Sequence, residues 1–167
     1  MENEIRELSE KAVELLLKNN MTVSFCESCT GGSIAKAITD ISGSSAVFGF
    51  GAVTYANEAK EKMVGVSHAS LEKYGAVSPA VAEEMAEGVK KLSGSDIAIS
   101  VTGIAGPGGG SEEKPVGLVY MGVAYKSTLY NKKLNFSGTR EEIRQKTVSQ
   151  SLNEIINIIN SEQIKRG

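Results

Sequence analysis

The segment CESCTGG, from Cys26 to Gly32, places two thiols, two hydroxyls and two glycines where a strand is expected to become a helix. The first backbone N–H groups of a helix lack partners, and the helix dipole is positive there. The hydroxyl of Ser28 could therefore attack a carbonyl while the amides near Cys29 and Gly31 hold the developing oxyanion. The same residues also suit an ordinary N-cap, in which a hydroxyl binds a helix amide.

The spacing of Cys26 and Cys29 is also that of a dithiol redox pair or of half a zinc site. A zinc site would need further ligands, but the chain contains a single histidine, His68, and no second CxxC motif. His68 stands at the expected start of a short helix and is interpreted as an ordinary surface or packing residue. We therefore predict no metal, and a redox role stays open as an alternative unless the strand turns Cys26 into the core, where a thiol is inert.

A second glycine-rich segment, SVTGIAGPGGGSEEKPVG, holds six glycines between Gly103 and Gly117. Such a backbone can approach a phosphate or a ribose closely. The segment has neither the Walker lysine spacing nor the GxGxxG pattern, so it predicts a ligand loop without naming a nucleotide fold. A flexible connection between two strands is the alternative interpretation.

Arg140 and Arg144 lie one helical turn apart near the start of the last expected helix. A cation in the first turn opposes the helix dipole at a cost of about 0.3 to 1 kcal/mol. A bound phosphate would offset this cost by pairing with the guanidinium. Glu141 and Glu142, as solvated neighbours, could do the same, and the sequence leaves both possibilities open.

The elements that position these groups follow from the spacing of apolar residues. Ser78 followed by Pro79 is a helix start signal, and Thr139 with Glu142 fits a capping box. Strands that alternate with helices, followed by a late hairpin, predict an α/β fold: one domain over residues 1–167, built as a three-layer α/β/α sandwich with a mixed β-sheet. The expected helices are residues 3–18, 30–39, 57–65, 67–75, 78–93 and 139–159, and the expected strands are 22–27, 46–55, 96–106, 114–125 and 128–138.

Composition narrows the class of protein. The chain has 167 residues, 41% of them hydrophobic and 23% charged, with a formal net charge of -2. Neither sign of charge is clustered, which argues against binding to nucleic acid or to an anionic membrane. No apolar run approaches the ~20 residues of a spanning helix, and the polar N-terminus is unlike a targeting signal, so we expect a cytoplasmic protein.

Five segments in order resemble a known family: CESCTGG, GSSAVFGFGAVTYANEAK, YGAVSP, VTGIAGPGGG followed by KPVG, and SGTREEIR. Together they are similar to the competence-damage-inducible protein C-terminal domain, the nicotinamide mononucleotide deamidase family, over about residues 5–160. Larger members of that family carry an additional N-terminal domain, and this chain resembles the stand-alone form. The resemblance implies hydrolysis of nicotinamide mononucleotide to nicotinic acid mononucleotide and ammonia, without metal or cofactor, by a self-associating protein that recycles pyridine nucleotides.

The resemblance also implies catalytic residues. The serine of the family's ESCTGG motif is the nucleophile and corresponds to Ser28, while the tyrosine and lysine of the TYxNExK segment correspond to Tyr55 and Lys60. A serine needs a base, and a lysine desolvated in a pocket can lose its proton, so Lys60 is the expected base. Tyr55 is expected to relay a proton to the leaving ammonia or to hold the serine hydroxyl in line.

Further residues are expected to bind the substrate around this triad. The amides of Cys29 and Gly31 would be the oxyanion donors, and the others would shape the cavity or line the ribose phosphate pocket. This chain departs from the family at Cys26, often alanine, and at Ala56, usually serine. A pyridine-nucleotide-binding or assembly module without activity is the alternative function, against which the intact triad argues. The complete set of expected binding residues is Cys29, Thr30, Gly31, Gly32, Ser45, Thr102, Gly103, Gly106, Gly108, Arg140 and Arg144.

Overall fold

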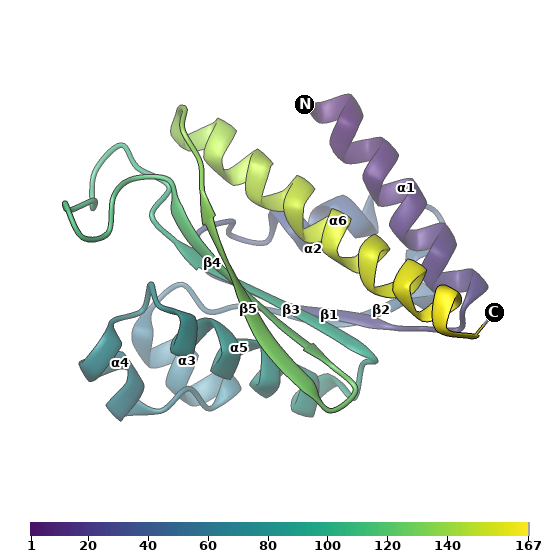
Figure 1. Ribbon diagram of the computed structural model, residues 1–167, viewed down its shortest axis with the longest axis horizontal. Helices are drawn as coiled ribbons and strands as arrows, with labels where there is room; N and C mark the ends of the chain where they lie inside the picture. The colour runs from purple at the N-terminus through teal and green to yellow at the C-terminus, as the bar shows by residue number, and fades with distance from the viewer. Residues whose placement is uncertain (167) are drawn as a thin grey trace.

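The computed structural model describes residues 1–166. Its five strands form one sheet in the order β2-β1-β3-β4-β5 (Figure 1). The strands are β1 (Val23–Glu27), β2 (Phe48–Val53), β3 (Ile97–Gly103), β4 (Leu118–Tyr125) and β5 (Thr128–Asn135). The helices are α1 (Glu2–Lys18), α2 (Ser33–Thr39), α3 (Asn57–Val64), α4 (His68–Tyr74), α5 (Pro79–Ser93) and α6 (Arg140–Arg166), with a short 3-10 helix η1 (Ser44–Ala46) before β2.

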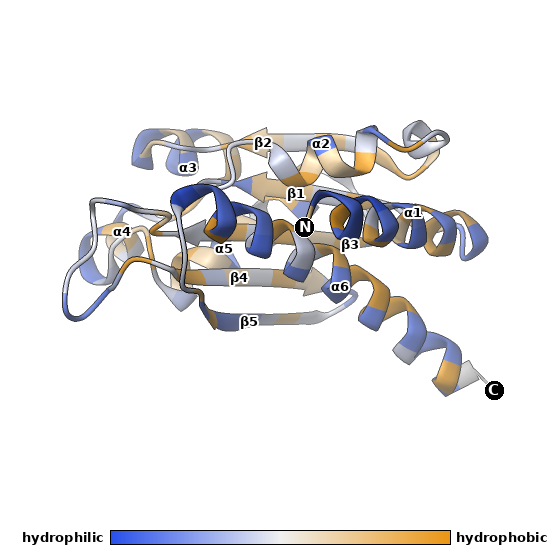
Figure 2. Cartoon of the chain, turned by 90° about the horizontal axis from the view of Figure 1, so that it is seen from above, coloured by the Kyte–Doolittle hydropathy of each residue, from blue (hydrophilic) through white to orange (hydrophobic). Residues whose placement is uncertain are grey.

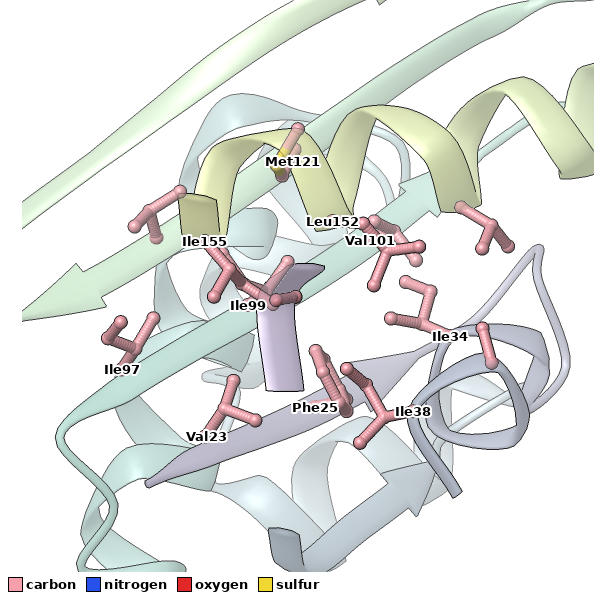
Figure 3. Close-up of a cluster of buried hydrophobic side chains, with 14 of the residues drawn as sticks. Val23, Phe25, Ile34, Ile38, Ile97, Ile99, Val101, Met121, Leu152 and Ile155 are labelled. Atoms are coloured by element: carbon pink, nitrogen blue, oxygen red, sulfur yellow. The ribbon is translucent and has the colours of Figure 1, made fainter. Parts of the chain in front are cut away.

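Helices cover both faces of the sheet, so the predicted three-layer α/β/α sandwich with a mixed sheet is confirmed. Helices α1, α2 and α6 lie on one face, and α3, α4 and α5 lie on the other (Figure 1). Alternate residues of a strand point to opposite faces. Accordingly, Phe25 and Ile99 pack with Leu152 of α6 in one core (Figure 3), whereas Cys26 and Ala98 belong to the core beneath α5.

The hydropathy of the elements agrees with these layers. Figure 2 shows hydrophobic residues along β1 and β3 at the centre of the sheet, and alternating hydrophilic and hydrophobic stretches along α1 and α6. Such alternation is typical of helices that bury one side. None of the helices within residues 1–166 combines the length and apolar composition needed to cross a membrane.

The sheet topology brings the carboxyl ends of β1, β2 and β3 to the same end of the sheet. Strand β1 pairs in parallel with β2 on one side and with β3 on the other. Strands β4 and β5 complete the sheet as the predicted antiparallel hairpin. The chain therefore crosses over on both sides of β1, and in open α/β sheets ligands bind outside the carboxyl ends of the strands at such a point. The residues that follow β1, β2 and β3 therefore lie close together at this end of the sheet.

The local start signals are met, with one correction. Ser78 caps α5 by accepting a hydrogen bond from the Val81 amide at 3.3 Å, and residues 139 and 142 form the expected capping box. Helix α2, however, begins at Ser33 and not at residue 30. Gly31 and Gly32 have φ angles of +60° and +96°, which are left-handed and cannot continue a right-handed helix.

Candidate active site

A pocket of about 290 Å³ lies at the carboxyl ends of β1, β2 and β3. Its walls come from the turn after β1, the start of α3, the segment before α5, the loop after β3 and the first residue of α6. The expected site residues that line it are Ser28, Cys29, Tyr55, Lys60, Thr102, Gly103, Gly106, Gly108 and Arg140.

Ser28 and Lys60 meet in this pocket. Ser28 directly follows β1, and its amide donates to the Val101 carbonyl of β3 at 3.0 Å, so the sheet holds its backbone. Lys60 lies on α3 and is 1% exposed. Its Nζ lies 3.1 Å from Ser28 Oγ, within hydrogen-bonding distance. The structure thus brings together the two residues expected to act as nucleophile and base.

The surroundings of Lys60 favour an uncharged amine. Desolvation by burial lowers the pKa of Lys60 below its ordinary value of 10.5, although the nearby thiols of Cys26 and Cys29 act in the opposite direction. Nζ donates to the Thr54 carbonyl at 2.8 Å and to the Tyr55 carbonyl at 3.4 Å. A neutral amine has two hydrogens and one lone pair, so these carbonyls can take both hydrogens and leave the lone pair for the serine hydroxyl.

Two amides of the turn after Ser28, those of Gly31 and Gly32, donate to acceptors of the protein itself. The Gly31 amide donates to the Ser28 carbonyl at 3.1 Å, and the Gly32 amide donates to the Glu27 carboxylate at 3.0 Å. Gly31 is therefore not free to donate to an oxyanion, which corrects that expectation. Within residues 1–166 the Cys29 amide donates to no other residue, and Cys29 lines the pocket.

Thr30, Gly31 and Gly32 do not line the pocket, which corrects their expected place in its wall. Thr30 is buried, and its hydroxyl donates to Glu27 Oε2 at 2.6 Å. Sequence reasoning missed Glu27. The available signal was an acidic residue next to the start of a helix, where the dipole favours a negative charge.

Tyr55 reaches the pocket at a different point from the one expected. Its hydroxyl accepts a hydrogen bond from Arg140 Nη2 at 3.1 Å, and its side chain does not hold the hydroxyl of Ser28. Arg140 Nη1 donates to the Gly106 carbonyl at 2.7 Å. Arg140 thus links Tyr55, in the segment between β2 and α3, to the glycine-rich loop. The backbone carbonyl of Tyr55, and not its phenol, is the group near Lys60.

Arg144 lies outside this pocket, which corrects its expected role as an alternative phosphate ligand. Its Nη2 donates to the Thr30 carbonyl at 2.9 Å and to Ser33 Oγ at 3.1 Å. The guanidinium lines a separate cavity of about 520 Å³ between α1, α2 and α6. Of the two arginines, Arg140 lines the candidate active site, and Arg144 binds the turn after β1 on the side away from the pocket.

Ser45 lies at the end of the sheet opposite to the pocket. It belongs to η1, which precedes β2, and the neighbouring Val47 carbonyl accepts the amide of Val23 at the start of β1. The five residues of β1 separate that end of the sheet from Ser28, a length of roughly 16 Å at about 3.3 Å per residue. Ser45 therefore does not line the pocket of its own chain, and the expectation is corrected.

The loop after β3 forms the remaining wall. The Thr102 hydroxyl donates to the Ala76 carbonyl at 2.8 Å, which places the segment before α5 beside the strand end. Gly103 packs closely against β4, because a Cβ there would come within 2.6 Å of the Val119 side chain. Lys114 Nζ donates to the Tyr74 carbonyl at 2.5 Å and ties the far part of the loop to α4.

The two cysteines do not form a reactive pair. Burial raises the pKa of Cys26 to about 11 and that of Cys29 to about 12, so both thiols stay protonated near neutral pH. They also pack into different cores on opposite faces of the sheet. This arrangement argues against the dithiol alternative. His68 is exposed, as expected, and within residues 1–166 no three His, Cys, Asp or Glu side chains are grouped to hold a metal ion.

Comparison with known proteins identifies the family. Residues 5–159 match the family described as CinA C-terminal domain. A CinA-like protein of Endomicrobium trichonymphae is 59% identical over 145 residues, and a Thermoanaerobacter sp. (strain X514) protein named as competence-damage inducible is 56% identical over 146 residues. These alignments cover 87% of this chain but only 34% and 35% of the relatives, so the chain spans about a third of their length.

A solved structure agrees with the match over nearly the whole chain. The competence/damage inducible protein CihA from Agrobacterium tumefaciens superposes with a TM-score of 0.90 at 43% identity, covering 94% of this chain and 96% of that one. Family match, sequence identity and fold all coincide over the segment that carries Ser28 and Lys60. The chain therefore belongs to the CinA C-terminal domain family.

Proposed function

We propose that residues 1–167 act as one amidohydrolase domain that converts nicotinamide mononucleotide and water to nicotinic acid mononucleotide and ammonia. The observation that carries the proposal is the 3.1 Å approach of Lys60 Nζ, an amine desolvated by burial, to Ser28 Oγ at the pocket wall. A buried amine beside a hydroxyl suits nucleophilic catalysis, because the uncharged amine can accept the hydroxyl proton. The reaction would serve recycling of pyridine nucleotides in the cytoplasm.

The first half of the proposed reaction forms an acyl-enzyme. Ser28 Oγ attacks the carboxamide carbon of the nicotinamide ring while Lys60 Nζ accepts the hydroxyl proton. The Cys29 amide donates to the oxyanion of the tetrahedral intermediate. The protonated Lys60 then returns its proton to the departing nitrogen, the C–N bond breaks, and ammonia leaves.

The second half reverses these roles with water. Lys60 Nζ takes a proton from a water molecule that attacks the Ser28 ester, and the proton passes to Ser28 Oγ as the ester bond breaks. The products are free Ser28 and nicotinic acid mononucleotide, whose carboxyl group ionises by releasing its proton to water. The chemistry requires only the serine, the amine and the amide donor, so we expect it to proceed in the presence of a metal chelator.

A non-catalytic nucleotide-binding or assembly module is the alternative. Such a module would have no use for a lysine whose amine is buried against a serine hydroxyl, since burying an amine is unfavourable. The wild-type protein, incubated with nicotinamide mononucleotide and a chelator, should release ammonia and nicotinic acid mononucleotide in equal amounts. Binding of the nucleotide without release of ammonia would favour the module instead.

Arg140 is the proposed phosphate ligand, since it lines the pocket and Arg144 does not. We expect Arg140→Gln to raise KM for nicotinamide mononucleotide by about tenfold or more, because it removes a charge-assisted contact to phosphate. KM for nicotinamide riboside, which lacks the phosphate, should change less than about twofold. Arg144→Gln is the control and should affect both substrates alike. Steady-state kinetics with both substrates measures the difference, and equal effects of Arg140→Gln on the two would contradict the assignment.

We also propose self-association of two copies through the β2 edge. Strand β2 has one neighbour, β1, and no charged residue, whereas the other edge, β5, carries Lys132 and Lys133, which discourage pairing. Phe50 and Val53 are exposed on β2. A Cβ at Gly49 would meet nothing within 4 Å, so packing within one chain does not require a glycine at this position. A second β2 strand that approaches edge to edge would require it, because another backbone would then lie close to Gly49.

Sedimentation equilibrium tests this contact. The wild-type protein should have the mass of a dimer, and Phe50→Glu should shift it toward the monomer by placing two like charges at the paired edges. Leu129→Glu on β5, a matched change at the opposite edge, should leave the mass unchanged. A monomeric wild type, or a dimer that only Leu129→Glu dissociates, would exclude the β2 contact.

A further inference from the structure

Glu27, the residue before the proposed nucleophile, is a carboxylate buried to 1% exposure. Its Oε1 accepts the Ala35 amide at 2.8 Å. Its Oε2 accepts the Thr30 hydroxyl at 2.6 Å and the amides of Gly32 and Ile34 at 3.0 and 3.1 Å. All four partners donate, which is the hydrogen-bonding pattern of an ionised carboxylate. The charge lies at the start of α2, where the peptide dipoles favour it.

These contacts close the segment that contains the proposed nucleophile into a loop. The backbone of Glu27 ends β1, and its side chain binds the residues at which the turn ends and α2 begins. Ser28 is one of the residues of this closed loop, which runs along the backbone from Glu27 to Ala35 and returns through the Glu27 side chain. Its own backbone is bound at both ends, since its amide donates to Val101 and its carbonyl accepts from Gly31. Besides these backbone contacts, the Glu27 side chain holds the turn that carries Ser28, because it joins the end of β1 to the start of α2.

The same contacts decide which amides remain for the substrate. The Glu27 carboxylate accepts the amides of Gly32, Ile34 and Ala35 around the start of α2. The Ser33 amide donates to the Thr30 carbonyl, and the Gly31 amide donates to the Ser28 carbonyl. Among residues 1–166 the Cys29 amide donates to no other residue, and Cys29 lines the pocket, whereas Thr30 does not. An anionic group of the substrate would have to displace Glu27 to bind at this helix start.

We propose that Glu27 is the positioning residue of Ser28, an inference that rests on the proposed function. Its carboxylate holds the turn so that Ser28 Oγ stays within reach of Lys60 Nζ, and it leaves the Cys29 amide, at the pocket wall, as the donor to the oxyanion. Because Glu27 fills the start of α2, the phosphate of the substrate binds elsewhere in the pocket.

A second buried carboxylate offers a matched control. Glu154 on α6 is 3% exposed and accepts hydrogen bonds from the Tyr130 hydroxyl at 2.6 Å and from Lys132 Nζ. Its partners lie on β5, and Glu154 does not line the pocket. Glu154→Gln therefore removes a buried charge from the fold without touching the turn that holds Ser28.

The test compares Glu27→Gln with Glu154→Gln. We expect Glu27→Gln to lower kcat for nicotinamide mononucleotide by about 100-fold, since a small misplacement of a reacting atom has an effect of that order. KM should change less than about threefold, because the change acts on the reacting atom more than on substrate binding. The pH dependence of kcat/KM should keep its midpoint, since Lys60 is unaltered. Glu154→Gln should keep kcat within about twofold of wild type.

Labelling of Ser28 by a fluorophosphonate gives a second readout that does not depend on the substrate. Glu27→Gln should be labelled more slowly than wild type, and Glu154→Gln at the wild-type rate. If Glu27→Gln does not fold, Thr30→Val removes one of the four hydrogen bonds at nearly constant volume. It should lower both rates in the same direction by a smaller factor.

Several outcomes would overturn the inference. Wild-type rates in Glu27→Gln would do so, as would equal losses in Glu27→Gln and Glu154→Gln. A shifted pH midpoint in Glu27→Gln would assign the residue an electrostatic effect on Lys60 in place of a positioning one. A wild type that is labelled at Ser28 but leaves nicotinamide mononucleotide intact would refute only the proposed substrate, and the labelling rates would still decide the role of Glu27. A wild type that is neither labelled nor active would refute both.

Discussion

Ser28→Ala should lower kcat for the deamidation of nicotinamide mononucleotide by about 10⁶-fold, the order of loss found when a catalytic serine is removed. The structure places Ser28 Oγ 3.1 Å from Lys60 Nζ and at the wall of the pocket, so its removal leaves an amine with no hydroxyl to activate. KM should change little, because the rest of the pocket is untouched. Ammonia release under saturating substrate measures the loss.

Cys26→Ser is the control for this result. The Cys26 thiol is fully buried and lies 3.3 Å from the Thr54 hydroxyl, with which a serine can also form a hydrogen bond. We expect ammonia release close to that of wild type. Loss of activity in Cys26→Ser together with full activity in Ser28→Ala would instead point to thiol chemistry and would refute the serine mechanism.

Lys60→Met should lower kcat/KM by about 10³-fold, within the 10² to 10⁴ range typical of a lost general base. Lys60→Arg should be almost as inactive, because a guanidinium stays protonated and cannot accept a proton from Ser28. The two variants together separate the need for a base from the need for a positive charge. An active Lys60→Arg would show that charge alone suffices and would contradict the proposed role.

The pH dependence of the wild type tests the same amine. Lys60 acts as a base only when uncharged, so kcat/KM should rise as the pH increases through the pKa of Lys60. Desolvation by burial lowers this pKa, which places the rise below the ordinary value of 10.5. A profile without such a rise below pH 10.5 would contradict an uncharged Lys60 as the base.

The same shift links pH to stability. In the unfolded chain Lys60 is exposed and keeps its ordinary pKa, so between the folded and unfolded pKa values the unfolded state binds more protons. The contribution of Lys60 to the free energy of unfolding therefore increases with pH across that interval. Below the folded pKa, Lys60 destabilises the fold to its full extent, since burial of the charged amine is unfavourable.

Much of the fold could be predicted from the sequence because its determinants are local. The apolar spacing of the last helix, the Ser78-Pro79 start and the capping box at residue 139 depend on neighbours within a few residues. The same holds for the hairpin of β4 and β5, whose connection is two residues long. The alternation of these elements then indicated the three layers. The position of Ser28 at a strand-to-helix turn followed from the same local pattern.

The site depended on contacts between distant segments. Arg140 and Arg144 are one turn apart and look equivalent in the sequence, yet Arg140 meets Tyr55 across 85 residues of chain and Arg144 meets Thr30 across 114. Which of them faces the pocket is decided by how α6 crosses the sheet. Ser45 differs from the expectation for a related reason, since its segment precedes β2 and so lies at the opposite end of the sheet from the carboxyl ends of β1, β2 and β3.

The sequence by itself therefore determined the class of fold, the order of its elements and the candidates for nucleophile and base. Only the tertiary structure decided that the amine of Lys60 is buried beside Ser28, that Glu27 occupies the amides of α2, and that Tyr55 turns its hydroxyl to Arg140. Local spacing sets which face of an element is apolar. Side-chain hydrogen bonds and desolvation arise only when elements pack, because both depend on what a neighbouring element places within a few ångströms.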